Sequence, residues 1–161
     1  RDLHKAIRRH RQMCIRDRDI DCLVNDLLFI KELKPEMVGI GPYLVHQNTP
    51  FKNQPNGDLK LTLFLLSLIR IMTKDVLLPA TTALATLDSN GRLEGINHGC
   101  NVVMPNLSPQ EVRKKYSLYD GKAASGQEAS EGLKELIDTL KTAGYEVVYE
   151  RGDYCKFDYE G

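Results

Sequence analysis

Two adjacent threonines, Thr81 and Thr82, follow directly on an apolar run and are the first residues in this sequence that could do chemistry. Paired hydroxyls at the end of a buried strand can donate hydrogen bonds to an anion or a cofactor in a site that excludes water. Threonine is also common at helix caps and in turns. The residues alone therefore leave two interpretations open, an anion site and an ordinary helix start.

A helix followed by a strand recurs three times in the first 105 residues, and these elements must position the threonine pair. The hydrophobic periodicity predicts helices over residues 21–33, 59–72 and 92–98, the first ended by Pro35 and the second capped by Asp58. Short apolar runs predict buried strands over residues 37–40, 77–80 and 101–104, the first broken by Gly41 and Pro42. This alternation favours an α/β fold with a parallel sheet and covering helices.

Parallel strands with polar loops at their carboxyl ends occur both in doubly wound sheets and in (β/α) barrels. No glycine-rich phosphate loop follows any of the three predicted strands, which weakens the dinucleotide-binding interpretation. A complete barrel needs about 250 residues. The 161-residue chain could therefore supply only part of one.

The last part of the sequence predicts a separate helix and strand. Ser108 and Pro109 are typical of a helix start, and the spacing of Ser125 and Glu128 predicts another. Gly144 is a natural residue for ending the second of these helices. The predicted apolar stripe comprises Leu133, Leu136, Ile137 and Leu140, and residues 145–150 form a strand candidate.

Composition and charge exclude several classes of function. Lys and Arg number 22 and Asp and Glu also number 22, so bulk charge favours neither nucleic acid nor a membrane as partner. The basic segment at residues 1–20 has no interleaved aromatic residues for stacking on bases. Residues 59–72 are too short and too polar to span a bilayer. The four cysteines show no C-x-x-C spacing and no secretory leader is visible, so we expect a cytoplasmic protein without a zinc site.

Several sequence motifs, taken together and in order, resemble one enzyme family. They are the run at residues 23–33, the run at residues 37–42, His46 with Thr49 and Pro50, the run at residues 79–83, the run at residues 101–106, and Tyr116, Tyr119, Gly121 and Lys122. This series, which covers roughly residues 21–122, is similar to the radical-SAM maturases of [FeFe] hydrogenase, of the HydE type. Biotin synthase and methylornithine synthase are related alternatives with a similar barrel.

The resemblance implies a fold and a set of roles. The fold would be a partial (β/α) TIM-type barrel, the C-terminal part of a radical-SAM barrel, followed by an α/β tail. Thr81 and Thr82 would bind an anionic group of a small-molecule or iron-complex substrate, and His46 would face the cavity mouth. Met104 and Tyr116 would line the S-adenosylmethionine pocket, and Tyr119 would lie near the radical path as the catalytic candidate. Other hydrogenase-maturation proteins are the implied partners.

Each of these residues also has a plain structural interpretation. Met104 follows two valines and is of a type common in cores. Tyr116 and Tyr119, three residues apart, could form one packed face of a helix. A single histidine on a polar loop, such as His46, is usually solvated.

The sequence departs from the family where the iron–sulfur cluster would be held. No C-x-x-x-C-x-x-C loop occurs, so the [4Fe–4S] ligands of the parent enzyme are absent and the chain is not expected to be active alone. The run at residues 13–18 has the character of a foreign join. We therefore expect a segment at residues 1–20, part of the barrel at residues 21–122 and a tail at residues 123–161. A non-catalytic α/β module that binds a small anion remains the alternative function.

Overall fold

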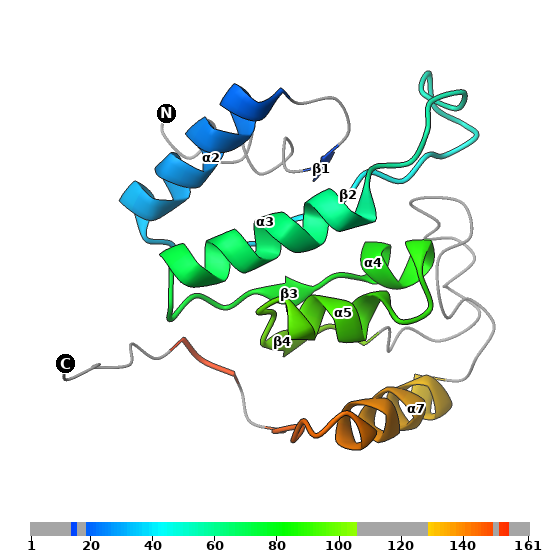
Figure 1. Ribbon diagram of the computed structural model, residues 1–161. Helices are drawn as coiled ribbons and strands as arrows, with labels where there is room; N and C mark the ends of the chain where they lie inside the picture. The colour runs from blue at the N-terminus through cyan, green and yellow to red at the C-terminus, as the bar shows by residue number, and fades with distance from the viewer. Residues whose placement is uncertain (1–13, 16–18, 106–128, 150–151, 155–161) are drawn as a thin grey trace.

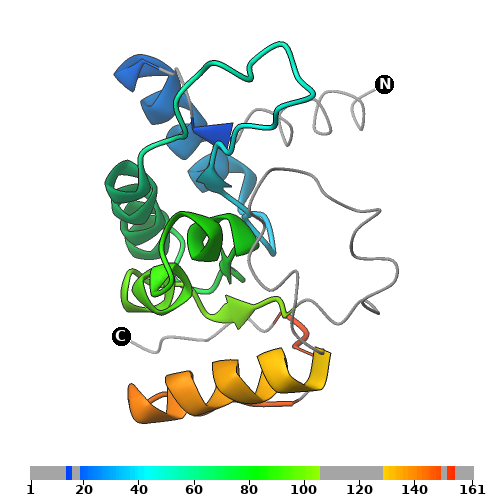
Figure 2. The same cartoon turned by 90° about the vertical axis from the view of Figure 1, so that its right-hand side faces the viewer.

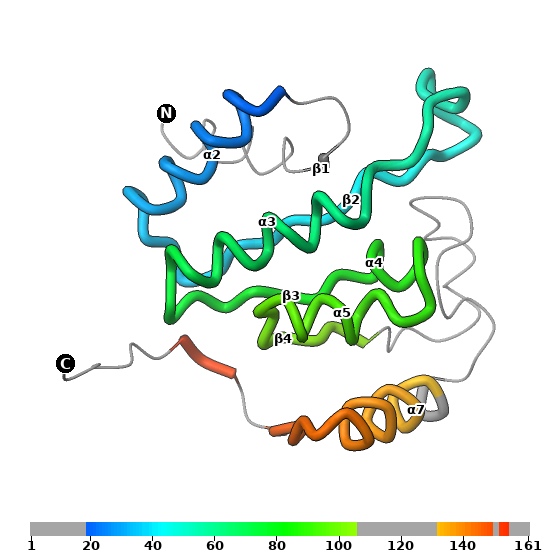
Figure 3. The backbone as a smooth tube through the Cα atoms, viewed as in Figure 1, coloured from blue at the N-terminus to red at the C-terminus, as the bar shows by residue number. Residues whose placement is uncertain are grey.

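The computed structural model describes residues 14–15, 19–105, 129–149 and 152–154. Helix and strand alternate along most of this path (Figures 1 and 3). The helices are α2 (Ile20–Leu33), α3 (Leu59–Met72), α4 (Thr82–Leu87), α5 (Gly91–Asn97) and α7 (Ala129–Thr142). The strands are β1 (Cys14–Ile15), β2 (Gly41–Pro42), β3 (Pro79–Ala80) and β4 (Val102–Val103). The predicted α/β class is therefore confirmed.

All strand pairing in the described residues is parallel, and it follows the order of the chain. β1 pairs with β2, and β3 pairs with β4. A single parallel bridge between Met37 and Leu77 joins the two pairs. The Val38 amide donates to the Leu77 carbonyl at 3.0 Å, and the Leu77 amide donates to the Glu36 carbonyl at 2.9 Å. The four extended segments therefore lie side by side in sequence order.

The structure corrects the predicted end of the first strand. Gly41 and Pro42, which we expected to break it, are the residues that pair with β1. Proline can occupy a strand where its missing N–H is not needed by the ladder. The run before them is also not buried on both faces, because Val38 and Ile40 are buried while Met37 is 46% exposed.

The hydrophobic core lies between the strands and helix α3. Leu66 and Ile69 of α3 pack in one cluster with Leu78 and Ala80 of the β3 segment, and all four are at most 1% exposed. Figure 2 shows α3 and α5 on the same side of the strands. Burying the apolar stripe of α3 against the strands is what fixes the position of β3 and of the residues that follow it.

α3 begins and ends as the sequence predicts, and α2 ends as predicted but begins one residue earlier. Asp19 caps α2 by accepting from the Cys22 amide at 2.7 Å, and Asp58 caps α3 by accepting from the Lys60 amide at 2.7 Å. Lys34 closes α2 in the left-handed conformation, with φ of 48°, immediately before Pro35. α5 begins one residue earlier than predicted and ends one residue earlier. Helix α4, which begins at the second threonine of the pair, was not anticipated.

The tail helix α7 ends as predicted, but the strand expected after it does not form. Gly144 has φ of 85° and donates to the Lys141 carbonyl at 3.0 Å, while Tyr145 donates to the Leu140 carbonyl at 2.9 Å. These two bonds form a Schellman cap. Residues 145–149 are not in a strand, because no other described segment pairs with their backbone. The predicted helix start at Ser108 and the helix start at Ser125 lie outside the described residues.

Some apolar surface remains uncovered. Ile20, Val24 and Leu28 lie four residues apart on α2 and are 77%, 45% and 55% exposed. In the part of the chain described, no helix is long and apolar enough to cross a membrane.

Candidate functional site

The candidate residues follow the carboxyl ends of neighbouring parallel strands. β2 leads into the loop that carries His46, β3 leads directly into Thr81, and β4 leads into Met104. In Figure 1, helix α4 and the loop after β2 both lie at the end of the molecule toward which β2 and β3 run. Because strands in a parallel sheet end at the same edge, these loops share one edge of the fold.

Thr81 lies where α4 packs against β2. It occupies the position before the first residue of α4, with φ of −73° and ψ of 157°, but its side chain makes no capping hydrogen bond. Its Oγ1 is buried and has no hydrogen-bond partner among the described residues. A methyl group built on Gly41 would lie 3.1 Å from this oxygen. The hydroxyl therefore points at the β2 backbone rather than along the α4 axis.

Thr82 is the first residue of α4 and is half-buried. Its carbonyl accepts a hydrogen bond from Thr86 Oγ1 at 3.0 Å. The backbone of Thr82 is thus tied into the helix. The two threonines are brought together as the sequence predicts, one before the helix and one inside it.

His46 lies at the neck of the loop after β2. Its Nδ1 accepts from the Asn48 amide at 3.0 Å, and its carbonyl accepts from both the amide and the hydroxyl of Thr49, at 3.1 and 2.8 Å. In the neutral ring, Nε2 must therefore carry the proton. No hydrogen bond in the described part of the chain joins His46 to either Thr81 or Thr82.

Two hydrogen bonds, one between backbone groups and one to a side chain, close the base of the same loop. The Gly57 amide donates to the Tyr43 carbonyl at 2.8 Å, and the Val45 amide donates to Asn56 Oδ1 at 2.9 Å. The rings of Tyr43 and Phe51 meet edge to face, with centroids 6.5 Å apart. These contacts hold the position of His46 relative to β2.

Met104 is not a core residue. It follows β4 and is 57% exposed, so the structural interpretation that placed it in the core is wrong. Its thioether is available at the edge where the strands end. Tyr116 and Tyr119 lie outside the described residues, and their roles stay predictions.

Neither cysteine whose side chain is described is placed to hold a metal. Cys22 is exposed on α2, whereas Cys100 is 4% exposed in the core. Burial raises the pKa of the Cys100 thiol from 9.0 to about 12, although the nearby Arg70 guanidinium opposes this shift. Among the described residues, no group of three His, Cys, Asp or Glu side chains could hold a metal ion.

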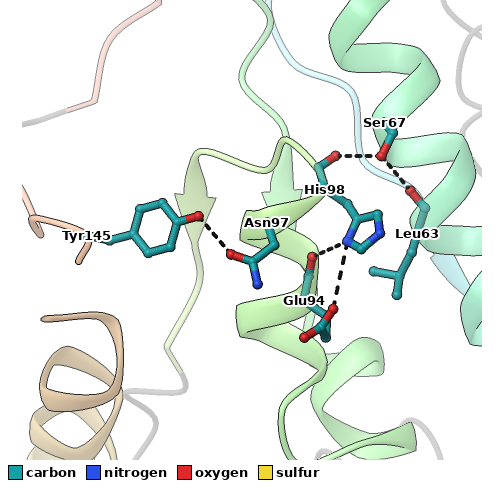
Figure 4. Close-up of polar contacts among 6 residues, drawn as sticks. All are labelled: Leu63, Ser67, Glu94, Asn97, His98 and Tyr145. Atoms are coloured by element: carbon teal, nitrogen blue, oxygen red, sulfur yellow. Dashed lines mark hydrogen bonds and ion pairs between the residues drawn. The ribbon is translucent and has the colours of Figure 1, made fainter. Parts of the chain in front are cut away.

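A second polar cluster joins α3, α5 and the segment after α7, and it has a structural role (Figure 4). Ser67 Oγ donates to the carbonyls of Leu63 and His98, at 3.3 and 3.4 Å, and not to the imidazole ring. His98 Nδ1 lies 2.8 Å from the Glu94 carbonyl. Ser67, His98 and Glu94 therefore do not form a nucleophilic triad. Because α5 ends where β4 is about to begin, this cluster lies at the strands' amino ends.

The C-terminal helix approaches this cluster. Tyr145 donates its hydroxyl to Asn97 Oδ1 at 2.8 Å, as Figure 4 shows. An open groove between α5 and α7 is lined by Leu93, Lys134, Glu135, Asp138, Thr139, Thr142 and Ala143. This groove is separate from the carboxyl edge of the strands.

Sequence reasoning missed the part played by Gly41. It treated the glycine as a strand breaker, whereas the structure places its backbone against the Thr81 side chain. The sequence feature that could have indicated this contact is a glycine followed by a proline at the end of an apolar run. Such a residue can mark the close approach of another group as well as a turn.

Two curated proteins are similar to part of the chain. No family model matches the chain. The chain is 48% identical over 103 residues to the [FeFe] hydrogenase maturase subunit HydE of Thermotoga maritima, covering 64% of this chain and 30% of that protein. It is 24% identical over 128 residues to the 3-methylornithine synthase of Methanosarcina acetivorans, covering 80% of this chain and 35% of the relative. The chain thus spans about a third of the length of these relatives. By sequence, this chain is therefore similar to the [FeFe] hydrogenase maturase subunit HydE and, at lower identity, to 3-methylornithine synthase.

Proposed function

We propose that this chain is the C-terminal part of a radical-SAM enzyme of the hydrogenase-maturase kind. In this proposal residues 21–122 form part of a (β/α) barrel, and residues 123–161 form a tail. The observation that carries the barrel is the strand order, because four parallel segments follow one another in sequence order. α3 and α5 lie on the same side of these strands (Figure 2). A doubly wound sheet would instead reverse its strand order and cover both faces with helices.

The roles proposed for individual residues depend on their position at the carboxyl ends of the parallel strands. Thr81 and Thr82 would donate hydrogen bonds to the anionic group of a small-molecule or iron-complex substrate. Two hydroxyls suit a carboxylate oxygen, which accepts from several donors at once. His46 would line the mouth of the cavity from the loop after β2. Support for the threonine role comes from the buried Thr81 hydroxyl, which has no partner among the described residues.

The S-adenosylmethionine pocket would draw on Met104 and Tyr116, with Tyr119 near the path of the radical. S-adenosylmethionine, bound with a reduced [4Fe–4S] cluster, supplies an adenosyl radical. The exposed Met104 thioether at the end of β4 suits the apolar part of such a nucleoside ligand. The cluster itself does not fit Cys22 or Cys100, since one lies on an exposed helix face and the other keeps its proton in the core. Its ligands would belong to a longer protein.

The wider setting is proposed on the same basis. The parent enzyme would act in the cytoplasm and would work with other hydrogenase-maturation proteins. HydE, the relative with 48% identity, is a hydrogenase maturase subunit, and this is the support for that partnership.

The first test is the sequence of the source DNA upstream of the codon for Arg1 and across residues 9–19. We expect it to encode the rest of a barrel, including a C-x-x-x-C-x-x-C loop. An upstream reading frame without that loop would refute the radical-SAM proposal. The non-catalytic anion-binding module would then be the surviving function, and it depends on the second test.

The second test asks whether the threonines bind an anion. The chain is labelled at the threonine methyl groups and titrated with acetate, with neutral acetamide as a control ligand. Thr81→Val and Thr82→Val should each weaken acetate binding by about tenfold, because a hydrogen bond to a charged group is lost. Thr86→Val is the matched control, since its hydroxyl is bonded to the Thr82 carbonyl within the helix. Equal affinity in all three variants would exclude the threonine pair as the anion site.

A further inference from the structure

The hydroxyl of Thr81 occupies an unusual position for a residue at the start of a helix. A threonine there usually turns its oxygen toward the free amides of the first turn. Here Oγ1 makes no such bond and is buried against β2 without a partner among the described residues. Thr81 as a whole is only half-buried, so the area that it exposes belongs to its other atoms.

Gly41 is the residue that makes room for this hydroxyl. A methyl group built on Gly41 would lie 3.1 Å from Thr81 Oγ1 and 3.7 Å from the Ala83 methyl. Gly41 does not need glycine for its backbone, because its φ is not among the positive values found at Gly99, Gly144 and Gly152. The missing side chain therefore matters for space alone. Gly39, two residues earlier on the same extended segment, has nothing within 4 Å of its added methyl.

A buried hydroxyl without an acceptor forfeits the hydrogen bonds that it makes in water. A threonine can correct this by moving to another staggered rotamer, which rotates Oγ1 away from Gly41. The position against Gly41 therefore costs the hydroxyl its hydrogen bonds, and an acceptor at another staggered position would favour rotation away from Gly41. An anion at the carboxyl edge would be such an acceptor.

We propose that Thr81 is a donor with two positions, which rests on the proposed role of the threonine pair in binding an anion. In the empty site its hydroxyl lies against Gly41, which we call the parked position. On binding a small carboxylate, the side chain turns by one rotamer and the hydroxyl donates to the ligand. Gly41 is the positioning residue, because it leaves space for the parked hydroxyl. The apparent affinity is then reduced by the fraction of molecules in which the hydroxyl is parked.

Filling the parked position should therefore tighten binding. Gly41→Ala places a methyl 3.1 Å from Oγ1, which is closer than an ordinary contact, so the rotamer that points Oγ1 at residue 41 becomes less favourable than one that points the small hydrogen of Thr81 Cβ there. The hydroxyl is then turned out before the ligand arrives, and acetate should bind roughly threefold or more tightly. Gly39→Ala, with open space around the added methyl, should bind acetate as the unsubstituted chain does.

The experiment measures the χ1 angle of Thr81 from three-bond couplings to its methyl carbon, together with acetate affinity, in the full chain. We expect the χ1 angle of the unsubstituted chain to change on saturation with acetate. We expect Gly41→Ala to show the bound χ1 angle without acetate and to bind acetate more tightly. The double variant Gly41→Ala with Thr81→Val should lose this gain.

Two kinds of failure are distinguishable. If Thr81→Val weakens binding but χ1 is the same with and without acetate, or Gly41→Ala binds no more tightly, the two-position inference is wrong and the anion site stands. If Thr81→Val binds acetate as well as the unsubstituted chain, the proposed anion role fails and the inference fails with it. The χ1 measurement on the unsubstituted chain decides the matter even if Gly41→Ala does not fold.

Discussion

Gly91 should be the least replaceable of the described glycines that have ordinary backbone conformations. It is the first residue of α5 and is buried against the end of α4. A methyl group on Gly91 would lie 2.1 Å from the Leu84 carbonyl oxygen and 2.5 Å from its carbonyl carbon. These are backbone atoms, so no side-chain rotation can relieve the overlap. The Leu84 carbonyl also accepts the Asp88 amide at 3.0 Å, which fixes it in the helix.

The magnitude follows from two opposing effects. Alanine in place of glycine within a helix normally stabilises by about 0.5–1 kcal/mol. Here α4 and α5 must separate by roughly 1 Å to bring the new contact to an ordinary distance. Overpacking of this kind costs about 1–3 kcal/mol, and occasionally more. Because Leu84 is fully buried, the separation would also loosen the core, so we expect Gly91→Ala to lower the free energy of unfolding by about 2 kcal/mol.

Urea denaturation of the chain provides the assay, with Gly39→Ala as the matched control. Gly39 has open space around the added methyl, so that variant should be neutral or stabilised by up to about 1 kcal/mol. With a urea dependence of about 1–3 kcal/mol per molar, the two midpoints should differ by about 1 M or more. Equal midpoints would show that the tight α4–α5 contact does not exist in solution.

Three further experiments test other parts of the fold. Burial raises the pKa of Cys100 from 9.0 to about 12, so the contribution of its protonated thiol to stability is complete below pH 9 and declines as the pH rises toward 12. Cys100→Ala should remove this part of the loss of stability at alkaline pH, measured as the melting temperature in thermal unfolding scans. An unchanged dependence of the melting temperature on pH would count against a buried thiol. A thiol reagent at pH 8 should modify Cys22 but leave Cys100 intact in the folded chain, and equal reactivity would contradict the core position. Asp58→Ala should lower the free energy of unfolding by about 1 kcal/mol, because the α3 cap is lost. Asp58→Asn should keep most of the stability of the unsubstituted chain, because asparagine also caps helices. Equal losses in the two variants would show that the charge of Asp58 matters rather than its capping hydrogen bond.

The sequence determined the helices because their signals are local. Asp58 caps α3, whose apolar stripe runs over the 14 residues that follow it, so both features lie in one short stretch of the chain. α7 ends at Thr142 because Gly144, which tolerates a positive φ, closes a Schellman cap two residues later. The alternation of helix and apolar run was enough to predict parallel strands and a polar carboxyl edge. The motif series was enough to indicate the similarity to the HydE maturase.

Only the tertiary structure shows which segments pair as strands and which residues of different elements come into close contact. Whether Gly41 and Pro42 break a strand or form one depends on β1, whose paired residues Cys14 and Ile15 each lie 27 positions earlier in the chain (41 − 14 and 42 − 15). Residues 145–149 have strand-forming side chains, but a strand exists only where another backbone pairs with it. The approach of the Thr81 hydroxyl to Gly41 joins residues of different elements, and no local pattern encodes that distance. Local chemistry therefore determined the elements and the candidate residues, while the packing of α4 on β2 decided how the threonine hydroxyl lies.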